Sequence, residues 1–447
     1  MSYTVGMVSL GCPKNQVDGE MLLSSLQNAG FTLCADVQEA DAVLVNTCGF
    51  IESAKKESIE EILKLARLKQ QGRLRALVVT GCLAERYREQ IQQEMPEVDV
   101  TVGIGANGQI ADLLANALQS HSKVETFPEK DALPLSGGRI LSTPPHTAYL
   151  KIAEGCDNRC SYCAIPLIRG RFRSRPIDDV VQEAETLAQS GVKELIVVAQ
   201  DTTRYGEDLY GRLELPALLR RLCRIPQVQW IRLLYCYPNR ITEELLDCMA
   251  EEEKILRYMD LPLQHCSRRI LRAMHRPGDP QSLLALVRHM REKLPGLVLR
   301  TTFIAGFPGE TEEDFEELAG FVRDAAFDRL GCFAYSQEED TPAAELPDQV
   351  EEDKKQRRAE QIMEIQMEIM EKLGQARVGQ TLDVLVEGYD EDAEQWFGRS
   401  YADAPEIDGL VLFSADTPPQ VGEIVPVAIT GAAGCDLFGV QAGEGGQ

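Results

Sequence analysis

The chain has 447 residues, of which 44% are hydrophobic and 26% are charged, a composition typical of folded globular proteins that excludes collagenous, coiled-coil and disordered classes. The length suits about three domains, and the net charge of −25 repels nucleic-acid phosphates and anionic membranes alike. Thirteen cysteines are too few for a disulfide scaffold at this length, and their odd number leaves at least one unpaired. Metal or cluster ligation is therefore the leading use expected of them.

No segment predicts export or membrane insertion. The first ten residues contain no Lys or Arg, and no apolar run approaches the roughly 20 residues that span a bilayer. The cytosol, where thiols stay reduced and can bind metal, is the expected location.

The first third of the chain alternates short β-branched runs with longer helical patterns, which is typical of a parallel sheet covered by helices. Strands are predicted at residues 5–9, 43–46 and 76–80, and each leads into a cysteine: Cys12, Cys48 and Cys82. Helices are predicted near 16–29 and 53–69. This pattern predicts a doubly wound N-terminal domain over residues 1–136.

The three cysteines are expected to converge, because the carboxyl ends of parallel strands meet at one edge of a doubly wound sheet, where ligands bind. The alternative is that they are three small buried thiols, since free cysteine is commonly buried. A small residue or turn-former flanks each one, and all three occupy the same position after their strands. This shared position favours one common site.

A linker rich in Gly, Ser, Thr and Pro at residues 137–147 precedes a second β/α series, predicted to span 148–374. Its six strands are expected at 148–152, 194–199, 230–234, 257–261, 298–304 and 330–334. Six such units predict an open or partial barrel of TIM type, whose chemistry gathers at the carboxyl ends of its strands. A long helix is predicted over 351–373.

The last segment, residues 375–447, changes to short strands and Gly-rich turns, which predicts a small antiparallel barrel. Strands are expected at 382–386 and 423–429. From residue 377 onward this segment contains two Arg, no Lys and 13 Asp or Glu, a net charge of about −11. So acidic a domain either binds a basic partner or is simply well solvated, and charge alone does not decide between the two.

The strongest chemical signal is a group of three cysteines, Cys156, Cys160 and Cys163, just after the first barrel strand. At spacings of four and three they can wrap one face of a cubane 4Fe–4S cluster, whose irons take thiolate ligands. A structural zinc site would need four ligands, usually as two separated pairs, and nothing nearby supplies the second pair. Three ligands on four irons leave one iron open for a substrate or cofactor.

This motif, with the aromatic residue Tyr162 immediately before its third cysteine, resembles the radical S-adenosylmethionine (SAM) superfamily. The resemblance implies that the open iron binds the amino and carboxyl groups of SAM, and that the reduced cluster cleaves SAM to a 5′-deoxyadenosyl radical. It also implies that Tyr162 packs near the adenine and that Gln200 and Asp201, after the second barrel strand, contact the methionyl part of SAM.

Taken together with Cys12, Cys48 and Cys82, this motif makes the resemblance more specific. The chain resembles the methylthiotransferase family. Members of that family carry a second 4Fe–4S cluster on three cysteines of an N-terminal domain, a radical SAM barrel and a C-terminal TRAM domain, in an order that matches essentially the whole chain. The resemblance implies that one SAM methylates a sulfur held on the second cluster. A second SAM, cleaved at the first cluster, yields the radical that abstracts hydrogen.

The family has two branches, one modifying an adenosine of tRNA and the other an aspartate of the small-subunit ribosomal protein S-twelve. Pro13 and Lys14, directly after the first cysteine, are similar to the protein-modifying branch, whereas the tRNA-modifying branch usually has Gln-Met there. Residues 46–56 and 404–409 point the same way, and Gly19, where Ser is more usual, is one departure. The acidic last domain agrees, because an RNA-binding TRAM domain should be basic.

The partners implied are therefore the basic ribosomal protein and an electron donor such as flavodoxin or ferredoxin. Neither direct tRNA binding nor membrane binding is expected, and the sequence does not identify the sulfur donor. Two rival functions remain. One is the same chemistry on tRNA, and the other is a non-enzymatic iron–sulfur redox sensor, which would release no 5′-deoxyadenosine from SAM.

Three further features carry weaker expectations. Arg171, Arg173 and Arg175 form a basic stripe that either holds a carboxylate bidentately or makes surface ion pairs. Residues 306–310, Gly-Phe-Pro-Gly-Glu, either cradle the adenosine or form a tight turn. His265 has no partner at a metal-ligand spacing and is expected to be structural.

Overall fold

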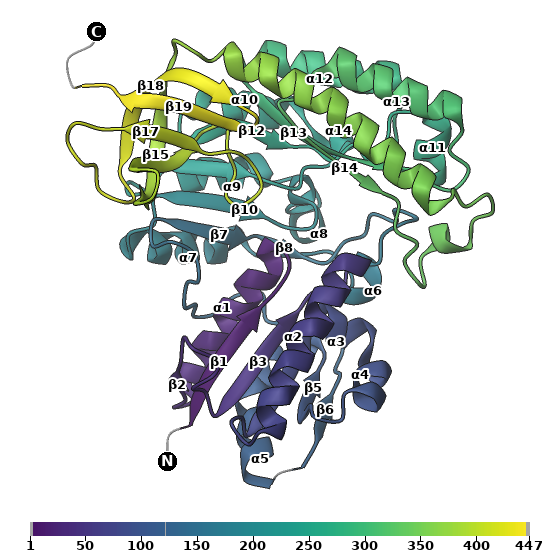
Figure 1. Cartoon of the computed structure of the whole chain (residues 1–447), viewed down its shortest axis with the longest axis vertical. Coiled ribbons are helices and arrows are strands. Elements are labelled where there is room, and N and C mark those ends of the chain that lie inside the picture. Colours follow the sequence, from purple (N-terminus) through teal and green to yellow (C-terminus); the bar gives the residue numbers. More distant parts are fainter. Residues whose placement is uncertain (1–2, 121, 444–447) are drawn as a thin grey trace.

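The computed structural model describes residues 3–120 and 122–443, so the outermost residues of the expected first and last domains, and His121, lie outside the described residues. The strands form three main sheets, drawn in turn from residues 4–126, 147–334 and 381–441. In Figure 1 the first sheet forms a lobe of its own, whereas the C-terminal barrel lies against the larger central part. The expected class, two parallel α/β sheets followed by a small β-barrel, is confirmed.

The N-terminal sheet is wholly parallel, with helices on both faces. Its elements are β1 (Thr4–Ser9), α1 (Pro13–Asn28), β2 (Thr32–Leu33), β3 (Ala42–Thr47), α2 (Glu52–Gln70), β4 (Ala76–Gly81), α3 (Cys82–Arg86), α4 (Arg88–Glu94), β5 (Val100–Val102), α5 (Ile110–Ser120) and β6 (Val124–Thr126). Successive side chains of a strand point to opposite faces. Ala42 and Leu44 of β3 accordingly pack with α1 and α5, whereas Val43 and Val45 pack with α2 and α4. The strand order is β2-β1-β3-β4-β5-β6.

The central sheet is also parallel, and its six strands pair in sequence order. They are β7 (Thr147–Lys151), β10 (Glu194–Val198), β11 (Trp230–Leu233), β12 (Ile255–Asp260), β13 (Val298–Ala305) and β14 (Arg329–Ala334). Each predicted strand is present to within two residues. In the described part of the chain β7 and β14 form the two edges and do not pair, so the barrel is open, as six β/α units predict.

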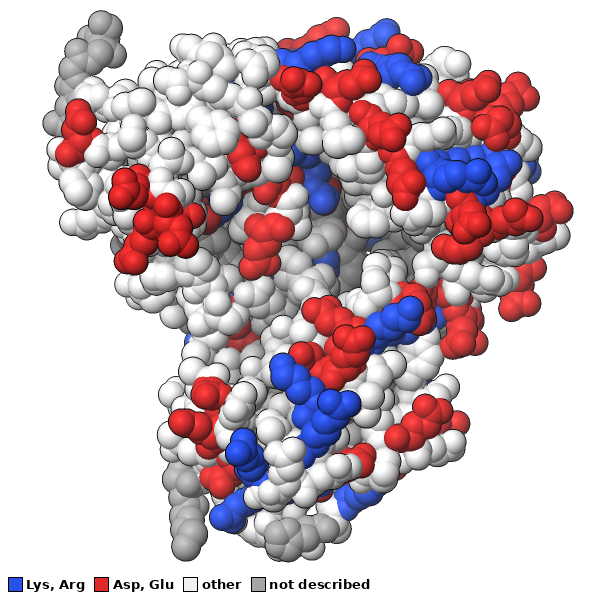
Figure 2. All heavy atoms as spheres, viewed as in Figure 1, with Lys and Arg blue, Asp and Glu red and all other residues white. Residues whose placement is uncertain are grey.

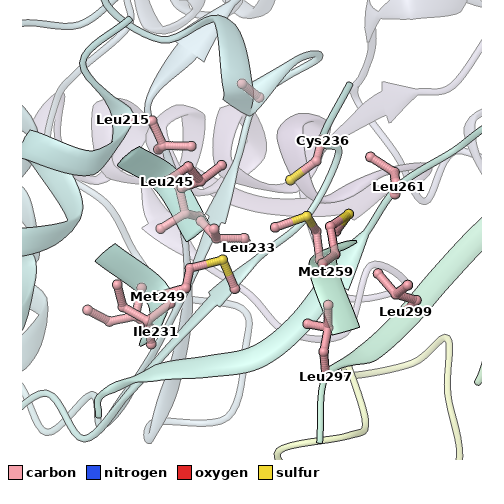
Figure 3. Close-up of a cluster of buried hydrophobic side chains, with 14 of the residues drawn as sticks. Leu215, Ile231, Leu233, Cys236, Leu245, Met249, Met259, Leu261, Leu297 and Leu299 are labelled. Atoms are coloured by element: carbon pink, nitrogen blue, oxygen red, sulfur yellow. The ribbon is translucent and has the colours of Figure 1, made fainter. Parts of the chain in front are cut away.

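Helices cover the outer face of this open barrel. They are α7 (Ile177–Gln189), α8 (Glu207–Tyr210), α9 (Leu215–Cys223), α10 (Glu243–Glu251), α11 (Arg268–Ala273), α12 (Pro280–Lys293), α13 (Glu312–Ala325) and α14 (Glu352–Gln375). Figure 3 shows part of the core between sheet and helices, where Leu245 and Met249 of α10 lie with Ile231 and Leu233 of β11. Burial of each such side chain contributes about 1.5–3 kcal/mol to stability. This packing holds in place the strands whose carboxyl ends carry the site.

The C-terminal barrel closes in the order β15-β16-β17-β19-β18. Its strands are β15 (Thr381–Asp390), β16 (Gln395–Ser400), β17 (Val411–Ser414), β18 (Ile424–Ala433) and β19 (Asp436–Gln441). One pair departs from the antiparallel prediction, because β17 and β19 run parallel. Strand directions can alternate all the way round a closed ring only if the number of strands is even, so a ring of these five must contain one parallel pair.

Buried charges join this barrel to the central domain. Arg399 of β16 lies 2.6 Å from Glu194 of β10, and Arg232 of β11 lies 2.9 Å from the same carboxylate. Arg232 also donates to the carbonyl oxygens of Ser400 and Tyr401 at 3.2 and 2.7 Å.

Among the helices that the structure describes, none has the length and apolar character needed to cross a membrane.

Candidate active site

Cys12, Cys48 and Cys82, here called the auxiliary cysteines, follow the carboxyl ends of three adjacent strands. Cys12 is the N-cap of α1, Cys48 directly follows β3, and Cys82 begins α3 directly after β4. The strand order reverses between β1 and β3, and such a reversal opens a crevice at the carboxyl edge of the sheet. Helix α1 begins at Pro13, three residues before the expected start, because proline suits the first helical position.

The three loops that carry the auxiliary cysteines approach one another closely, and glycine makes this approach sterically feasible. Gly11 has a φ of +96°, and a Cβ there would lie 2.8 Å from the Cβ of Cys48. Gly81 has a φ of +94°, and a Cβ there would lie 2.5 Å from the carbonyl oxygen of Thr47. Residues with side chains are strained in such positions, so the glycines beside Cys12 and Cys82 allow the loops to meet.

Cys156, Cys160 and Cys163, here called the loop cysteines, lie between β8 (Ala153–Glu154) and α6 (Ile165–Arg169). A short antiparallel pairing of β8 with β9 (Arg173–Ser174), which the sequence did not predict, closes the base of this loop. At its tip, Ser161 donates through its backbone N–H to the Met274 carbonyl at 3.1 Å and through its hydroxyl to the Ala273 carbonyl at 2.7 Å. The loop is therefore held at both ends.

Both cysteine sets line one cavity of about 410 Å³. Its wall is formed in part by aromatic side chains, Phe50, Tyr162, Tyr235 and Tyr237. The auxiliary cysteines come from the N-terminal domain and the loop cysteines from the central barrel. Two thiol sets that lie far apart in the sequence thus face the same cavity.

The thiols are not arranged around a single metal ion. Within residues 3–120 and 122–443, no group of three or more His, Cys, Asp or Glu side chains could hold one ion. The thiolates around one zinc ion all lie about 2.3 Å from it, whereas those of a cubane cluster bind different irons and lie farther apart. The donor set therefore fits iron–sulfur ligation better than the zinc alternative.

Burial controls the ionisation of most of these thiols. It raises the pKa of Cys82 to about 12, of Cys156 to about 11 and of Cys163 to about 12. Burial also opposes ionisation of Cys12, but the neighbouring charges of Lys14 and Arg169 outweigh it and lower the pKa of that thiol. Thiolate ligation of a metal releases the thiol proton, so cluster binding should be accompanied by proton release at these positions.

A buried charge network connects the two domains behind the cavity wall. Arg169 of α6 lies 2.5 Å from Asp18 of α1 and donates to the sulfur of Cys82 at 3.2 Å. Lys151 of β7 also contacts Asp18, and it lies 2.8 Å from Glu154 of β8. The charges of two cations and two carboxylates thus balance. Through Arg169 the network also fixes the position of Cys82 relative to β8, the strand before the loop cysteines.

Of the three residues expected to contact SAM, the structure places two in the cavity and one outside it. Tyr162 and Gln200 line the cavity, and the Oε1 of Gln200 is buried without a hydrogen-bond partner, so it is available to a ligand. Asp201 is not among the lining residues. Its carboxylate instead accepts hydrogen bonds from Asn158 at 2.8 Å and Arg240 at 2.9 Å, which makes Asp201 a residue that orients the cavity wall.

The basic stripe lies away from the cavity. The side chain of Arg171 is 88% exposed, Arg173 donates to the carbonyl of Asp131 at 2.7 Å, and Arg175 lies 2.8 Å from Asp179. None of the three arginines lines the cavity, and the partner of Arg171 is Asp157, 3.8 Å away and directly after Cys156. The structure therefore favours the reading in which the stripe makes ion pairs within the protein.

The 306–310 segment is a tight turn, in which the backbone N–H of Gly306 donates to Glu310 at 2.9 Å. It does not line the cavity. His265 is buried 3.4 Å from the same Glu310, which agrees with a structural role. Two arginines that no sequence motif signals, Arg169 and Arg276, also line the cavity. Only the folded chain brings them beside the cysteines.

Comparisons with known proteins agree with this architecture. Residues 4–103 match the uncharacterized protein family UPF0004, residues 150–322 match the radical SAM superfamily, and residues 378–441 match the TRAM domain. Among solved structures, the chain resembles the radical SAM methyltransferase TsrM from Kitasatospora setae, with a TM-score of 0.57 and 16% identity over 87% of this chain and 79% of that one. At that identity the likeness concerns the fold alone.

Curated relatives match along nearly their whole length. The chain is 51% identical to the ribosomal protein uS12 methylthiotransferase RimO of Desulforamulus reducens, over 98% of this chain and 99% of the relative. It is 47% identical to the protein of the same name from Clostridioides difficile, over 97% of this chain and 98% of the relative.

The domain order, the paired cysteine sets and these matches define a radical SAM methylthiotransferase, an enzyme class that uses a 4Fe–4S cluster and SAM. Within that class, the chain belongs to the RimO family.

Proposed function

We propose that this protein transfers a methylthio group to the β-carbon of an aspartate in ribosomal protein uS12, with two SAM molecules and two 4Fe–4S clusters. The observation that carries the proposal is the cavity of about 410 Å³ that the auxiliary and loop cysteines share. A radical centre and a sulfur-donating centre must act on the same carbon atom. One cavity lined by both thiol sets meets that requirement.

We assign the loop cysteines to the cluster that binds SAM, with Tyr162 and Gln200 beside it, and the auxiliary cysteines to a second cluster. When bound, these groups supply the 5′-deoxyadenosyl radical and the methylated sulfur. The chain itself orients the ligands, since Arg169 holds Cys82 at 3.2 Å and Arg276 lies 3.7 Å from the sulfur of Cys160. The aromatic and apolar wall excludes water, which limits side reactions of a reactive intermediate.

The bond to be broken explains why such cofactors are required. The β-carbon of aspartate carries C–H bonds that are neither acidic nor attached to an electrophilic centre, so a general base or a nucleophile has nothing to act on. Chemistry of this kind is left to a cofactor, while the protein binds, orients and shields the substrate. The buried wall of the cavity and its fixed loops are suited to that task.

The C-terminal barrel supports a basic protein substrate rather than tRNA. Its two arginines face the central domain, where Arg399 binds Glu194 and Arg377 lies 3.8 Å from Asp328. The turn between β15 and β16 is exposed and acidic, and Figure 2 shows a group of acidic side chains at the edge of this barrel, whose face is otherwise mostly uncharged. Ribosomal proteins are basic because they neutralise RNA phosphate, so this surface should attract them and repel tRNA.

Neutralising this turn is expected to slow the association of uS12 several-fold and to change its dissociation less, because distant charges act mainly on encounter rates. The changes are Asp390→Asn, Glu391→Gln, Asp392→Asn and Glu394→Gln. Stopped-flow association should also slow as salt reduces the screening length from about 10 Å to about 3 Å. Glu57→Gln with Glu60→Gln, on the exposed side of α2, is the control, and equal slowing per charge removed in the two sets would contradict steering by the barrel.

The proposed reaction is tested by anaerobic incubation of the reconstituted protein with SAM, a reductant, sulfide and uS12. Mass spectrometry should show uS12 with one hydrogen replaced by a methylthio group on an aspartate. Modification of tRNA in preference to uS12 would replace this proposal with the tRNA-modifying activity. Absence of 5′-deoxyadenosine under the same conditions would favour a redox sensor.

We also propose the domain division 1–136, 137–147, 148–374 and 375–447. It is supported by sheets that occupy residues 4–126, 147–334 and 381–441, with β7 starting one residue before the proposed boundary.

A ribosomal substrate would place the enzyme in the cytosol, where flavodoxin or ferredoxin can serve as electron donor.

A further inference from the structure

The shared cavity contains a lysine that no carboxylate contacts directly. Lys14 of α1 lines the cavity and is only 7% exposed. Its ammonium nitrogen lies 3.2 Å from the centre of the Tyr235 ring. Among the described residues, no Asp or Glu oxygen lies within 4.0 Å of that nitrogen. The charge of Lys14 is therefore directed at an aromatic face and at the cavity.

The other two basic residues of the cavity are engaged elsewhere. Arg169 is neutralised by Asp18 and also reaches Glu154 at 3.5 Å. Arg276 donates to the hydroxyl of Tyr162 at 3.4 Å and lies near Cys160, so it belongs to the side of the loop cysteines. Lys14 belongs with the auxiliary cysteines, two residues after Cys12. No acidic residue within the described ranges lines the cavity.

Such an arrangement leaves the ammonium group of Lys14 available to a ligand. Burial opposes its charged form, but Tyr235, Cys12 and Glu154 outweigh burial and raise the pKa of Lys14, so the group stays charged. Its direct contact is the aromatic face of Tyr235, which does not compete strongly with an anion for its N–H donors. An anion that enters the cavity would gain a charge-assisted hydrogen bond from Lys14. The side of the cavity at Lys14 therefore favours an anionic ligand over a neutral one.

We propose that Lys14 binds the side-chain carboxylate of the substrate aspartate and makes the enzyme specific for aspartate. This inference rests on the proposed function. In aspartate, the carboxylate carbon is bonded directly to the β-carbon that receives the sulfur. A group that holds the carboxylate must therefore lie beside the sulfur-donating centre, which is where Lys14 lies relative to Cys12.

The test compares the binding of uS12 with that of a uS12 variant carrying Asn at the target position. The reconstituted protein should bind the Asp form at least about tenfold more tightly, because an amide lacks the charge that pairs with the ammonium. Lys14→Met should abolish this preference, and Lys14→Arg should retain much of it. Lys64→Met, whose side chain is 67% exposed on α2, is the control and should leave the preference unchanged. Iron content equal to that of the parent shows that each variant is folded and loaded.

Binding of SAM distinguishes the two carboxylates that could reach Lys14. If Lys14→Met weakens SAM binding and leaves the Asp preference intact, Lys14 serves the methionyl carboxylate and the inference is overturned. If the parent modifies uS12 but binds the Asp and Asn forms equally, the inference fails and the proposed function stands. If the parent does not modify uS12, both fail. Loss of the Asp preference in Lys14→Arg as well as in Lys14→Met would show that charge is not what selects the substrate.

Discussion

Cys48→Ala is expected to separate SAM cleavage from sulfur transfer. The reduced Cys48→Ala protein should still release 5′-deoxyadenosine from SAM, because Cys48 follows β3 of the N-terminal sheet and the loop cysteines are untouched. It should form no methylthiolated uS12. Cys160→Ala should abolish both products, since it removes a proposed ligand of the cluster that binds SAM. Chromatography of 5′-deoxyadenosine and mass spectrometry of uS12 measure the two activities separately.

Iron content provides an independent check of this division of roles. The parent should bind about eight irons after anaerobic reconstitution, and a variant with all three loop cysteines changed to Ala about four. Cys435→Ala is the matched control, because Cys435 is exposed and lies in the C-terminal barrel, and it should change neither iron content nor activity. Equal loss of SAM cleavage in Cys48→Ala and Cys160→Ala, with both chains folded, would contradict two separate centres.

The sequence predicted the position of the cysteines better than it predicted their surroundings. Short β-branched runs define strands, and the carboxyl ends of parallel strands share an edge. The placement of Cys12, Cys48 and Cys82 after three such runs therefore predicted that they would meet. The parallel pairing of β17 with β19 could not be read from the same signals, since it depends on how the ring of strands closes.

The charged residues of the cavity were harder to predict for a physical reason. Whether an arginine faces a ligand depends on contacts between distant segments, as between Arg169 and Asp18, which are 151 residues apart. The stripe at Arg171, Arg173 and Arg175 follows the loop cysteines directly in the sequence, yet none of its members lines the cavity. Lys14 marks the protein-modifying branch in the sequence, and only the fold shows that it lies in the cavity without a carboxylate in contact.

Glu194→Gln is expected to destabilise the junction between the C-terminal barrel and the central domain. Glu194 is fully buried and lies 2.6 Å from Arg399 and 2.9 Å from Arg232. Removing its charge leaves Arg232 without a carboxylate partner and Arg399 with Glu387 alone, and breaking a buried ion pair in this way costs about 3–5 kcal/mol. Denaturant unfolding should show this loss. Glu391→Gln, on the exposed turn, should change the free energy of unfolding by less than about 0.5 kcal/mol.

The same carboxylate should make the junction sensitive to acid. Burial opposes the ionisation of Glu194, but Arg399 and Arg232 outweigh it and lower its pKa from 4.5 to about 2. As the pH falls, the unfolded chain takes up this proton before the folded one does, so the stabilisation is present above about pH 4.5 and is lost toward about pH 2. Over that interval the parent should lose about 3 kcal/mol more than Glu194→Gln, which has no carboxylate to titrate. Because both chains carry the same clusters and the same other acids, parallel acid curves for the two would mean that Glu194 does not hold the barrel in place through its charge.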